Sequence, residues 1–367
     1  MSTSLVPAAL RGVPWGILFL VVALTGFGLV VLYSAAGGRL MPWALPQGVR
    51  FVVFLAGAMA LSRMREETLK RVALPAYLLL VMLLVGVEAL GVVGGGSRRW
   101  LDLKIIRLQP SELMKPVIVL ALAAFYDHMP AAQMRRFSAI WPAALMIGVP
   151  FALVLVQPDL GTALMIAFGG VTAMFLAGIP LRLFVAAAAA AAALTPIALA
   201  RMHDYQRSRI EIFLNPESDP LGSGYHIIQS KIAIGSGGVT GKGFLHGTQS
   251  HLDYLPEGHT DFAFATMAEE WGLVGGLGII LAYSCVIGWG VKVALAASTR
   301  FGRIAAAGLA TTIFFYVTIN MLMVMGLAPV VGIPLPLISW GGSAMMTVLI
   351  CVGLLMAIDR NGRMRPR

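Results

Sequence analysis

Two carboxylates, Glu257 and Asp261, close a long polar segment of this chain. The segment covers residues 201–261, and an apolar helix is predicted to begin immediately after it. Paired carboxylates suggest acid–base chemistry, as in glycosyl transfer or hydrolysis. A carboxylate at the mouth of a membrane span is costly to desolvate, so it is a candidate for function. The alternative is that Asp261 only caps the following helix, and the spacing by itself favours that alternative.

Two glycine-rich runs mark the same polar segment. They are Gly222–Tyr225 and Gly235–Gly243, and the second run carries Lys242. So many glycines predict backbone that bends tightly or lies close to a ligand. No second histidine or cysteine supports His259 as a metal ligand, so we expect a surface histidine and no metal site.

A second polar group precedes another predicted span. It begins with Gln109 and Pro110, and Ser111 is the expected N-cap of a helix with Glu112 in its first turn. Glu112 and Lys115 are three residues apart and share a helix face. The pair is either a simple ion pair beside a cap or the lining of a polar cavity within the bundle, and the sequence leaves both open.

Two further stretches interrupt the apolar sequence. Residues 157–162 join two predicted spans, and Asp159 must find partners at that depth. Residues 326–343 are rich in proline and glycine and end at Ser343. Such a stretch is a poor helix, so we predict a re-entrant or external loop, which is tolerated where it is buried in protein or lines a cavity.

The composition requires elements that lie in a membrane. The chain is 58% hydrophobic and 12% charged, whereas soluble domains carry about 25% charged residues. We predict an all-α polytopic membrane protein in which residues 1–367 form one domain that includes the 201–261 loop. The ten expected spans are roughly 13–35, 49–62, 72–93, 111–127, 139–157, 161–179, 182–200, 262–291, 304–328 and 341–358.

The net charge of +10 fits a membrane protein better than a nucleic-acid-binding one. No basic surface interleaved with stacking aromatic residues is evident, and cytoplasmic loops collect Lys and Arg. With ten spans both termini lie on one side. If that side is the cytoplasm, 15 of the 27 basic residues are internal, and the 201–261 loop is external.

The predicted external loop at residues 94–110 departs from this charge rule. It holds four basic residues, namely Arg98, Arg99, Lys104 and Arg107. Basic residues kept on the outer face suggest an anionic ligand there, although short outer loops also tolerate some arginine. Trp100 in the same loop is typical of a residue at the membrane interface.

In this order, these stretches resemble one family, the SEDS proteins (shape, elongation, division and sporulation). The chain is most similar to the RodA-type branch, through residues 247–252 and 325–332 among others, and the resemblance covers about residues 15–358. The chain departs from the family pattern at four positions, which are Lys104 for Gly, Ala263 for Ile, Trp340 for Tyr and Ala344 for Ser.

The resemblance implies a glycosyltransferase of the bacterial cytoplasmic membrane that polymerises lipid II on the outer face with inversion. It implies that Asp261 is the catalytic base, and that basic residues neutralise the leaving diphosphate. The residues expected to bind substrate are Arg50, Trp100, Arg107, Gln109, Glu112, Lys115, Asp159, Lys242, Glu257 and Ser343. A divalent cation such as Mg²⁺ or Mn²⁺ could share the neutralisation, although no dedicated metal cage is evident.

The family resemblance also implies a partner, a class B penicillin-binding protein that supplies the transpeptidase. Small residues favour contacts between helices in a membrane, so Ala305–Ala310 and Gly341–Ala344 are candidate docking faces. Two other functions stay open. A lipid flippase fits the many spans, and a scaffold that only activates the penicillin-binding protein would not need Asp261.

Overall fold

The ten predicted spans are all helical in the computed structural model, which describes residues 12–94, 97–102, 107–130, 133–134, 136–200, 204–219, 222–252, 254–255 and 257–364. The corresponding helices are α1 (Trp15–Ala35), α2 (Ala44–Leu61), α3 (Glu66–Leu90), α4 (Pro110–Asp127), α5 (Phe137–Val156), α6 (Leu160–Leu176), α7 (Leu181–Ala200), α11 (Ala263–Ala296), α12 (Arg300–Val324) and α13 (Gly342–Met364). Within the described ranges, seven helices are long and apolar enough to cross a membrane, and α6 and α7 contain shorter apolar helices. The chain is therefore a multi-pass membrane protein.

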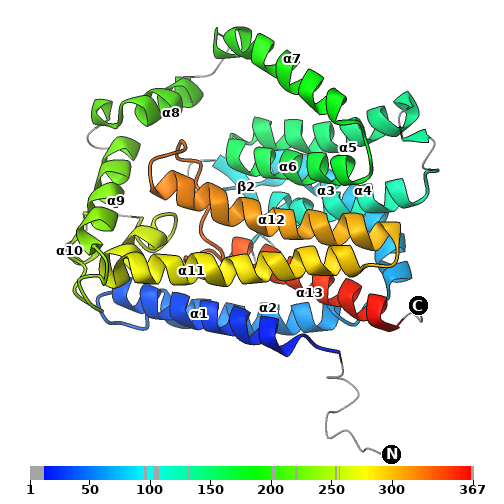
Figure 1. Ribbon diagram of the computed structural model, residues 1–367. Helices are drawn as coiled ribbons and strands as arrows, with labels where there is room; N and C mark the ends of the chain where they lie inside the picture. The colour runs from blue at the N-terminus through cyan, green and yellow to red at the C-terminus, as the bar shows by residue number, and fades with distance from the viewer. Residues whose placement is uncertain are drawn as a thin grey trace, which may run out of the picture.

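The long helices run side by side across the view of Figure 1. The start of α1 and the end of α13 lie at the same end of the bundle, as an even number of spans requires, and α9 and α10 lie at the other. The two ends are called below the terminal end and the loop end.

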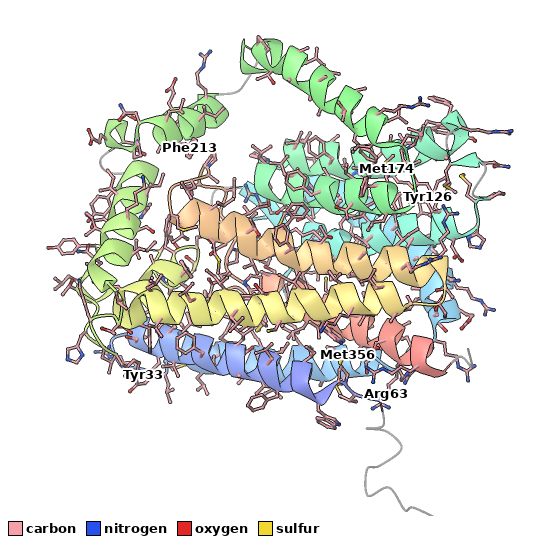
Figure 2. All side chains as sticks on the ribbon, in the orientation of Figure 1. Tyr33, Arg63, Tyr126, Met174, Phe213 and Met356 are labelled. Carbon is pink, nitrogen blue, oxygen red and sulfur yellow. The ribbon has the colours of Figure 1, made fainter. Side chains whose placement is uncertain are left out.

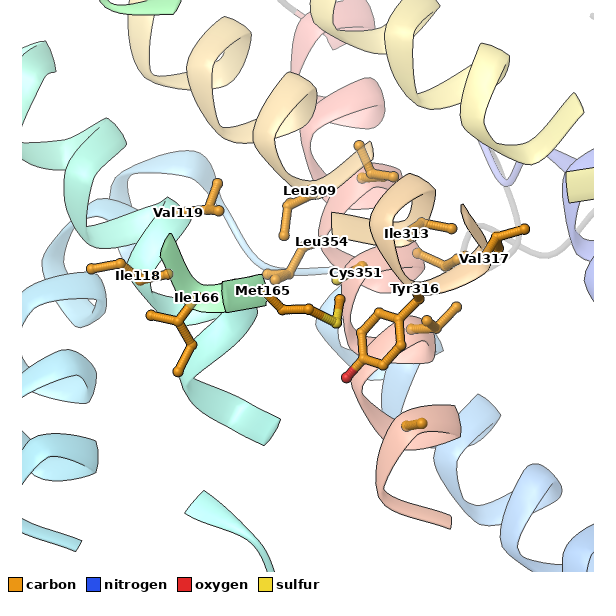
Figure 3. Packing of buried hydrophobic residues seen from close by; sticks show 14 of the residues in the cluster. Ile118, Val119, Met165, Ile166, Leu309, Ile313, Tyr316, Val317, Cys351 and Leu354 are labelled. Atoms are coloured by element: carbon orange, nitrogen blue, oxygen red, sulfur yellow. The ribbon is translucent and has the colours of Figure 1, made fainter. Parts of the chain in front are cut away.

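Helices α4, α12 and α13 form the centre of the bundle. Figure 3 shows side chains from these helices packed together with Met165 of α6. Small residues bring the helices close, since a Cβ added at Gly308 of α12 would lie 2.5 Å from a methyl group of Val119 on α4. Close backbone approach of this kind is the usual basis of helix association in a membrane.

The polar segment that precedes α11 is largely helical. It contains α8 (Asp204–Leu214), a 3₁₀ turn (Pro216–Ser218), α9 (Ser223–Gly237) and α10 (Thr248–His251). Helix α9 packs against α11, and it approaches so closely that a Cβ at Gly237 would overlap the carbonyl oxygen of Ala268. The part of the segment that contains α9 therefore packs against the bundle, whereas its polarity had suggested a loop.

Helix α11 is broken at Gly272, which has φ 61° and ψ −158°. Residues 238–243, here called the glycine loop, fill the break. The amides of Leu273 and Val274 donate to the loop carbonyls of Gly238 (3.0 Å) and Val239 (3.1 Å). In the other direction, the loop amides of residues 242 and 243 donate to the helix carbonyls of residues 269 and 270, both at 3.0 Å. The break thus keeps these backbone groups hydrogen-bonded, as burial demands.

A small antiparallel sheet lies between α3 and α4, where only helices and loops were expected. Its strands are β1 (Val92–Gly94), β2 (Ser97–Asp102) and β3 (Arg107–Leu108), in the order β1-β2-β3. Trp100 is opposite Val92, and Asp102 is opposite Arg107. The predicted departure at Lys104 lies outside the described residues.

Candidate active site

Asp261 lies in a tight turn at the loop end of the bundle. The turn is closed by the amides of Thr260 and Phe262, which both donate to the carbonyl oxygen of Glu257 at 3.1 Å. The N-cap position of α11 is Phe262, which makes no side-chain capping bond, so Asp261 lies one residue before the cap. This placement does not support the alternative in which Asp261 is simply the N-cap of the helix.

The stretch from 326 to 341 folds back into the protein and is here called the re-entrant loop. Leu335, Leu337 and Ile338 are each at most 2% exposed, so of the two predicted forms, re-entrant or external, the structure favours the re-entrant one for this part of the stretch. Its backbone is held by side chains from the surrounding helices. Gln47 of α2 donates to the carbonyl of Ser339 at 2.9 Å, and Tyr283 of α11 donates to the carbonyl of Pro336.

Asn320 of α12 joins the turn of Asp261 to the re-entrant loop. Its buried amide nitrogen donates to the carbonyl oxygen of Asp261 at 2.9 Å and to that of Ile333 at 2.7 Å. The Asp261 carboxylate faces the same loop, since a Cβ added at Gly332 would lie 3.5 Å from its Oδ2 atom. Gly332 also has a φ of +70°, so this position both bends the chain and leaves space beside the carboxylate.

A cation and three aromatic rings surround this turn. The amide of Trp340 donates to the carbonyl of His259 at 2.8 Å, and the guanidinium of Arg50 lies 4.3 Å from the centre of the Trp340 ring. The His259 ring stacks on Trp43, with centroids 4.0 Å apart and planes at 9°. Burial lowers the pKa of His259, and the Glu257 carboxylate opposes that effect. The structure thus brings Arg50 to the same end of the bundle as Asp261.

Glu112 and Lys115 form an ion pair inside the bundle. The Lys115 ammonium lies 2.6 Å from Glu112 and 2.7 Å from the Tyr316 hydroxyl, and its side chain is 1% exposed. Tyr316 donates to Glu112, and Thr347 lies 3.1 Å from the same carboxylate. The structure therefore favours the ion-pair alternative, with the addition that the pair belongs to a buried network of polar side chains. Contact of Glu112 or Lys115 with substrate stays a prediction.

The start of α4 differs from the prediction in one respect. The N-cap is Gln109, without a side-chain capping bond, and Pro110 is the first helical residue. Ser111 is therefore inside the helix, where it is 1% exposed. Proline at the first helical position fits because its missing amide hydrogen needs no partner there.

Asp159 has a separate set of partners. Its carboxylate accepts from the amide of Thr162 at 3.1 Å as the N-cap of α6, and it lies 3.6 Å from Arg99 on β2. Arg99 also donates to the carbonyls of Gln157 (3.1 Å) and Pro158 (2.5 Å). These bonds fasten the small sheet to the α5–α6 turn, so one of the basic residues that were predicted to be external has partners within the protein and needs no ligand.

Lys242 is bonded within the protein. Its ammonium lies 2.6 Å from the fully buried carboxylate of Glu269 and 2.8 Å from the Thr248 hydroxyl. The same carboxylate accepts from the backbone amides of Thr248 and Gln249 at 2.9 to 3.2 Å. Lys242 thus stabilises the glycine loop beside the break in α11, and its predicted role in substrate binding stays a prediction.

The remaining residues that were predicted to bind substrate lie on different elements of the fold. Glu257 is exposed and accepts from the Thr260 hydroxyl. Ser343 lies in the first turn of α13, where its carbonyl accepts from Thr347 at 3.1 Å. Trp100 is half-buried on β2, and the backbone of Arg107 belongs to β3.

Sequence reasoning missed three polar residues that organise the site. They are Asn320 and Tyr316 on α12 and Thr347 on α13. The available signal was a polar side chain inside a predicted apolar span, because such a group must find a partner within the bundle. Asn320 and Tyr316 are four residues apart, so one face of α12 supports both the turn and the buried ion pair.

A protein-only metal centre is not evident among the described residues. These residues contain no group of three or more His, Cys, Asp or Glu side chains that could hold a metal ion.

Comparison with known proteins identifies relatives along almost the whole chain. The profile of the FtsW, RodA and SpoVE family, described as "Cell cycle protein", matches residues 15–364. Peptidoglycan glycosyltransferase MrdB of Escherichia coli K12 is 43% identical over 348 residues, which are 95% of this chain and 93% of the relative. Stage V sporulation protein E of Bacillus subtilis is 37% identical over 287 residues, which are 78% of this chain and 77% of that one.

Solved structures agree with these sequence matches. A structure described as "Structural coordination of polymerization and crosslinking by a peptidoglycan synthase complex" matches with a TM-score of 0.83 and 33% identity, over 96% of this chain and 98% of the other. The crystal structure of the rod-shape-determining protein RodA of Thermus thermophilus matches with a TM-score of 0.72 and 30% identity over the same shares.

Proposed function

This chain belongs to the FtsW/RodA/SpoVE family, and from that premise we propose that it is a peptidoglycan glycosyltransferase of the RodA type. It joins lipid II disaccharide units into β-1,4 glycan strands at the outer face of the bacterial cytoplasmic membrane, during cell elongation and the maintenance of rod shape. The observation that carries the residue assignment is the position of Asp261. Its turn, the re-entrant loop and Asn320 meet at one point of the loop end, where Arg50 supplies a positive charge.

In this proposal the Asp261 carboxylate acts as the general base. It accepts the proton of the acceptor 4-hydroxyl as that oxygen forms a bond to the anomeric carbon of the donor. The bond from that carbon to the diphosphate breaks on the opposite side, so an α-linked donor gives a β-linked product. The diphosphate is a good leaving group, and therefore a second carboxylic acid is not required.

The other residues of the site position Asp261 and neutralise the negative charge of the leaving diphosphate. Asn320 fixes the backbone of the turn, and Gly332 leaves space beside the carboxylate. Arg50 is exposed and lies beside the Trp340 ring. We therefore assign to it the neutralisation of the negative charge on the leaving diphosphate. A divalent cation such as Mg²⁺ or Mn²⁺ would share the neutralisation of this diphosphate.

The test is polymerisation of purified lipid II by the purified protein with its partner. Asp261→Asn keeps the shape of the side chain and removes the base, so glycan synthesis should fall by about 10²–10⁴-fold. Glu257→Gln is the matched control and should cost less. Near-normal glycan synthesis by a folded Asp261→Asn protein would contradict the assignment and favour the flippase or scaffold alternatives.

We also propose a class B penicillin-binding protein as the partner. The docking faces expected on α12 and α13 are less accessible than predicted, because Ala305, Ala306 and Ala344 are at most 1% exposed inside the bundle. A contact on the lipid-facing side of α11 fits better. Leu273, Leu277 and Leu281 are 55–66% exposed in one stripe that begins directly after the break at Gly272.

A photo-crosslinker at Leu277 should therefore capture the partner in cells. The same crosslinker at Ala306 should not, because this side chain is enclosed by the bundle. Capture only from other lipid-facing helices would move the docking surface but leave the pairing intact.

A further inference from the structure

A surface cavity of about 540 Å³ lies between α2 and α13. Its wall is almost entirely apolar, and it includes Val53, Gly57, Ala60, Met64, Met346 and Ile350. Positions 53 to 61 extend over roughly 12 Å at the rise of a helix, and Met64 lies beyond the end of α2. Gly57 leaves room in the wall, since a Cβ added there would meet no heavy atom within 4 Å. The cavity is therefore a groove along the bundle that has the dimensions of an apolar chain.

Two arginines lie close to Met64, a residue of the groove wall, at the terminal end of the bundle. Arg63 precedes the groove residue Met64 in the chain, and Arg360 reaches it from α13. The Arg360 guanidinium donates to the carbonyl of Arg63 at 2.5 Å, and Asn361 donates to the carbonyl of Met64 at 3.1 Å. Figure 2 labels Arg63 at this end of the bundle, near the end of α13. Both arginine side chains are half-buried and interact electrostatically with each other.

Two of the neighbouring carboxylates pair with other basic residues. Asp359 receives two hydrogen bonds from Arg363, at 3.0 and 2.7 Å, and Glu66 pairs with Lys70 at 3.2 Å. In the part of the chain that the structure describes, no ion pair joins a carboxylate to Arg63 or Arg360. Two like charges held together repel each other, and a bound anion would relieve that repulsion.

We propose that this groove binds an anionic phospholipid. One acyl chain lies along the apolar wall between α2 and α13, and the phosphate lies against Arg63 and Arg360. Guanidinium groups suit phosphate because they donate several hydrogen bonds in a plane. Basic residues at the membrane surface attract anionic lipids. These charges at the mouth favour a lipid over a helix of another protein, which would need only the apolar wall.

Native mass spectrometry of the full-length protein, delipidated in detergent, can test this proposal. Titration with phosphatidylglycerol should give one tightly bound lipid, whereas phosphatidylcholine and inorganic phosphate should not compete for the site. Arg63→Gln with Arg360→Gln should weaken phosphatidylglycerol binding by about 25-fold, or about fivefold for each charge. Arg63→Lys with Arg360→Lys keeps both charges and should retain most of the binding, so a folding defect is distinguishable.

Two further variants separate the groove from general surface charge. Gly57→Leu fills the groove and should abolish tight binding, whereas Arg303→Gln removes an exposed charge of α12 and should change nothing. Equal binding of the two lipids, or full binding by the double glutamine variant or by Gly57→Leu, would overturn the proposal. A photo-crosslinker at Val53 that captures a protein helix in cells instead of lipid would also overturn it.

Discussion

His259 lies two residues before the proposed base and stacks flat on Trp43. Because the stack is half-buried, the pKa of this imidazole is lowered from its ordinary value of 6.5. The turn that carries Asp261 therefore contains a group that prefers to be neutral, and its carbonyl is also the acceptor for Trp340. Protonation of His259 would disturb the stack directly beside the site.

The stability of the protein should depend on pH through His259. Below pH 6.5 the unfolded chain binds a proton more readily than the folded one, so the free energy of unfolding should fall as the pH falls from 6.5 towards the lowered pKa. His259→Gln should make this loss smaller. Thermal unfolding of both proteins between about pH 7.5 and 5.5 measures the difference.

Glu257→Gln provides the opposite control for this prediction. The Glu257 carboxylate raises the pKa of His259, so its removal should lower that pKa further and increase the acid-side loss. Identical pH slopes in all three proteins would show that His259 is not the group responsible.

At the residue scale, the sequence predicted the important charges better than their partners. Asp261, Glu112 and Lys115 were singled out because charge within an apolar sequence is costly. Asn320 was not singled out, because an uncharged polar residue within a predicted span often has only a structural role. Its function follows only from two carbonyl oxygens that belong to distant parts of the chain, at residues 261 and 333.

At the element scale, the break in α11 has a clear steric requirement. Gly272 has a backbone conformation that glycine adopts far more easily than other residues, and a Cβ there would lie only 2.6 Å from the carbonyl oxygen of Val239. The glycine loop can supply its hydrogen bonds only if the two backbones remain this close. The break and the loop therefore depend on each other.

Gly272→Ala should destabilise the protein by at least ~1–3 kcal/mol, the usual cost of such backbone strain. Gly278→Ala is a matched control in the same helix, because a Cβ there meets no heavy atom within 4 Å. It should be neutral or stabilising by ~0.5–1 kcal/mol. Thermal unfolding in detergent compares the two, and equal midpoints would contradict the structural account of the break.

The helical spans could be predicted from the sequence because hydropathy and length are local properties. The segment between residues 201 and 261 could not, because its polarity conceals that α9 packs against α11. Its glycines suggested a ligand or a tight bend, and the structure shows a protein backbone in contact with them. A contact between residues 30 or more positions apart leaves no periodic signal in one sequence.

At the scale of the whole molecule, the arrangement of the helices places the start of α1 and the end of α13 at one end. The basic residues near the terminal end then predict a cytoplasmic location for that end, and an external location for the loop end. This orientation is also the one that a polymerase of exported lipid II requires. The predicted single domain agrees with the contacts of α9 and the re-entrant loop with the bundle, but folding of the chain as one unit stays a prediction.

Cysteine labelling in spheroplasts should test the orientation. In a Cys285→Ser background, Ser218→Cys should react with an impermeant thiol reagent, because Ser218 is exposed at the 3₁₀ turn after α8. Arg363→Cys, at the end of α13, should react only after the membrane is permeabilised. The reverse pattern would invert the proposed topology.

The length of α11 has a consequence for how the chain enters the membrane. As one straight helix its 34 residues would measure about 51 Å, but the hydrocarbon layer is only about 30 Å thick. The break at Gly272 divides the helix, so the part from Leu273 to Ala296 would measure about 36 Å, which is closer to the thickness of the hydrocarbon layer. Hydrophobic mismatch would thus favour a depth at which the turn of Asp261, before the break, lies nearer the membrane surface than the rest of the helix.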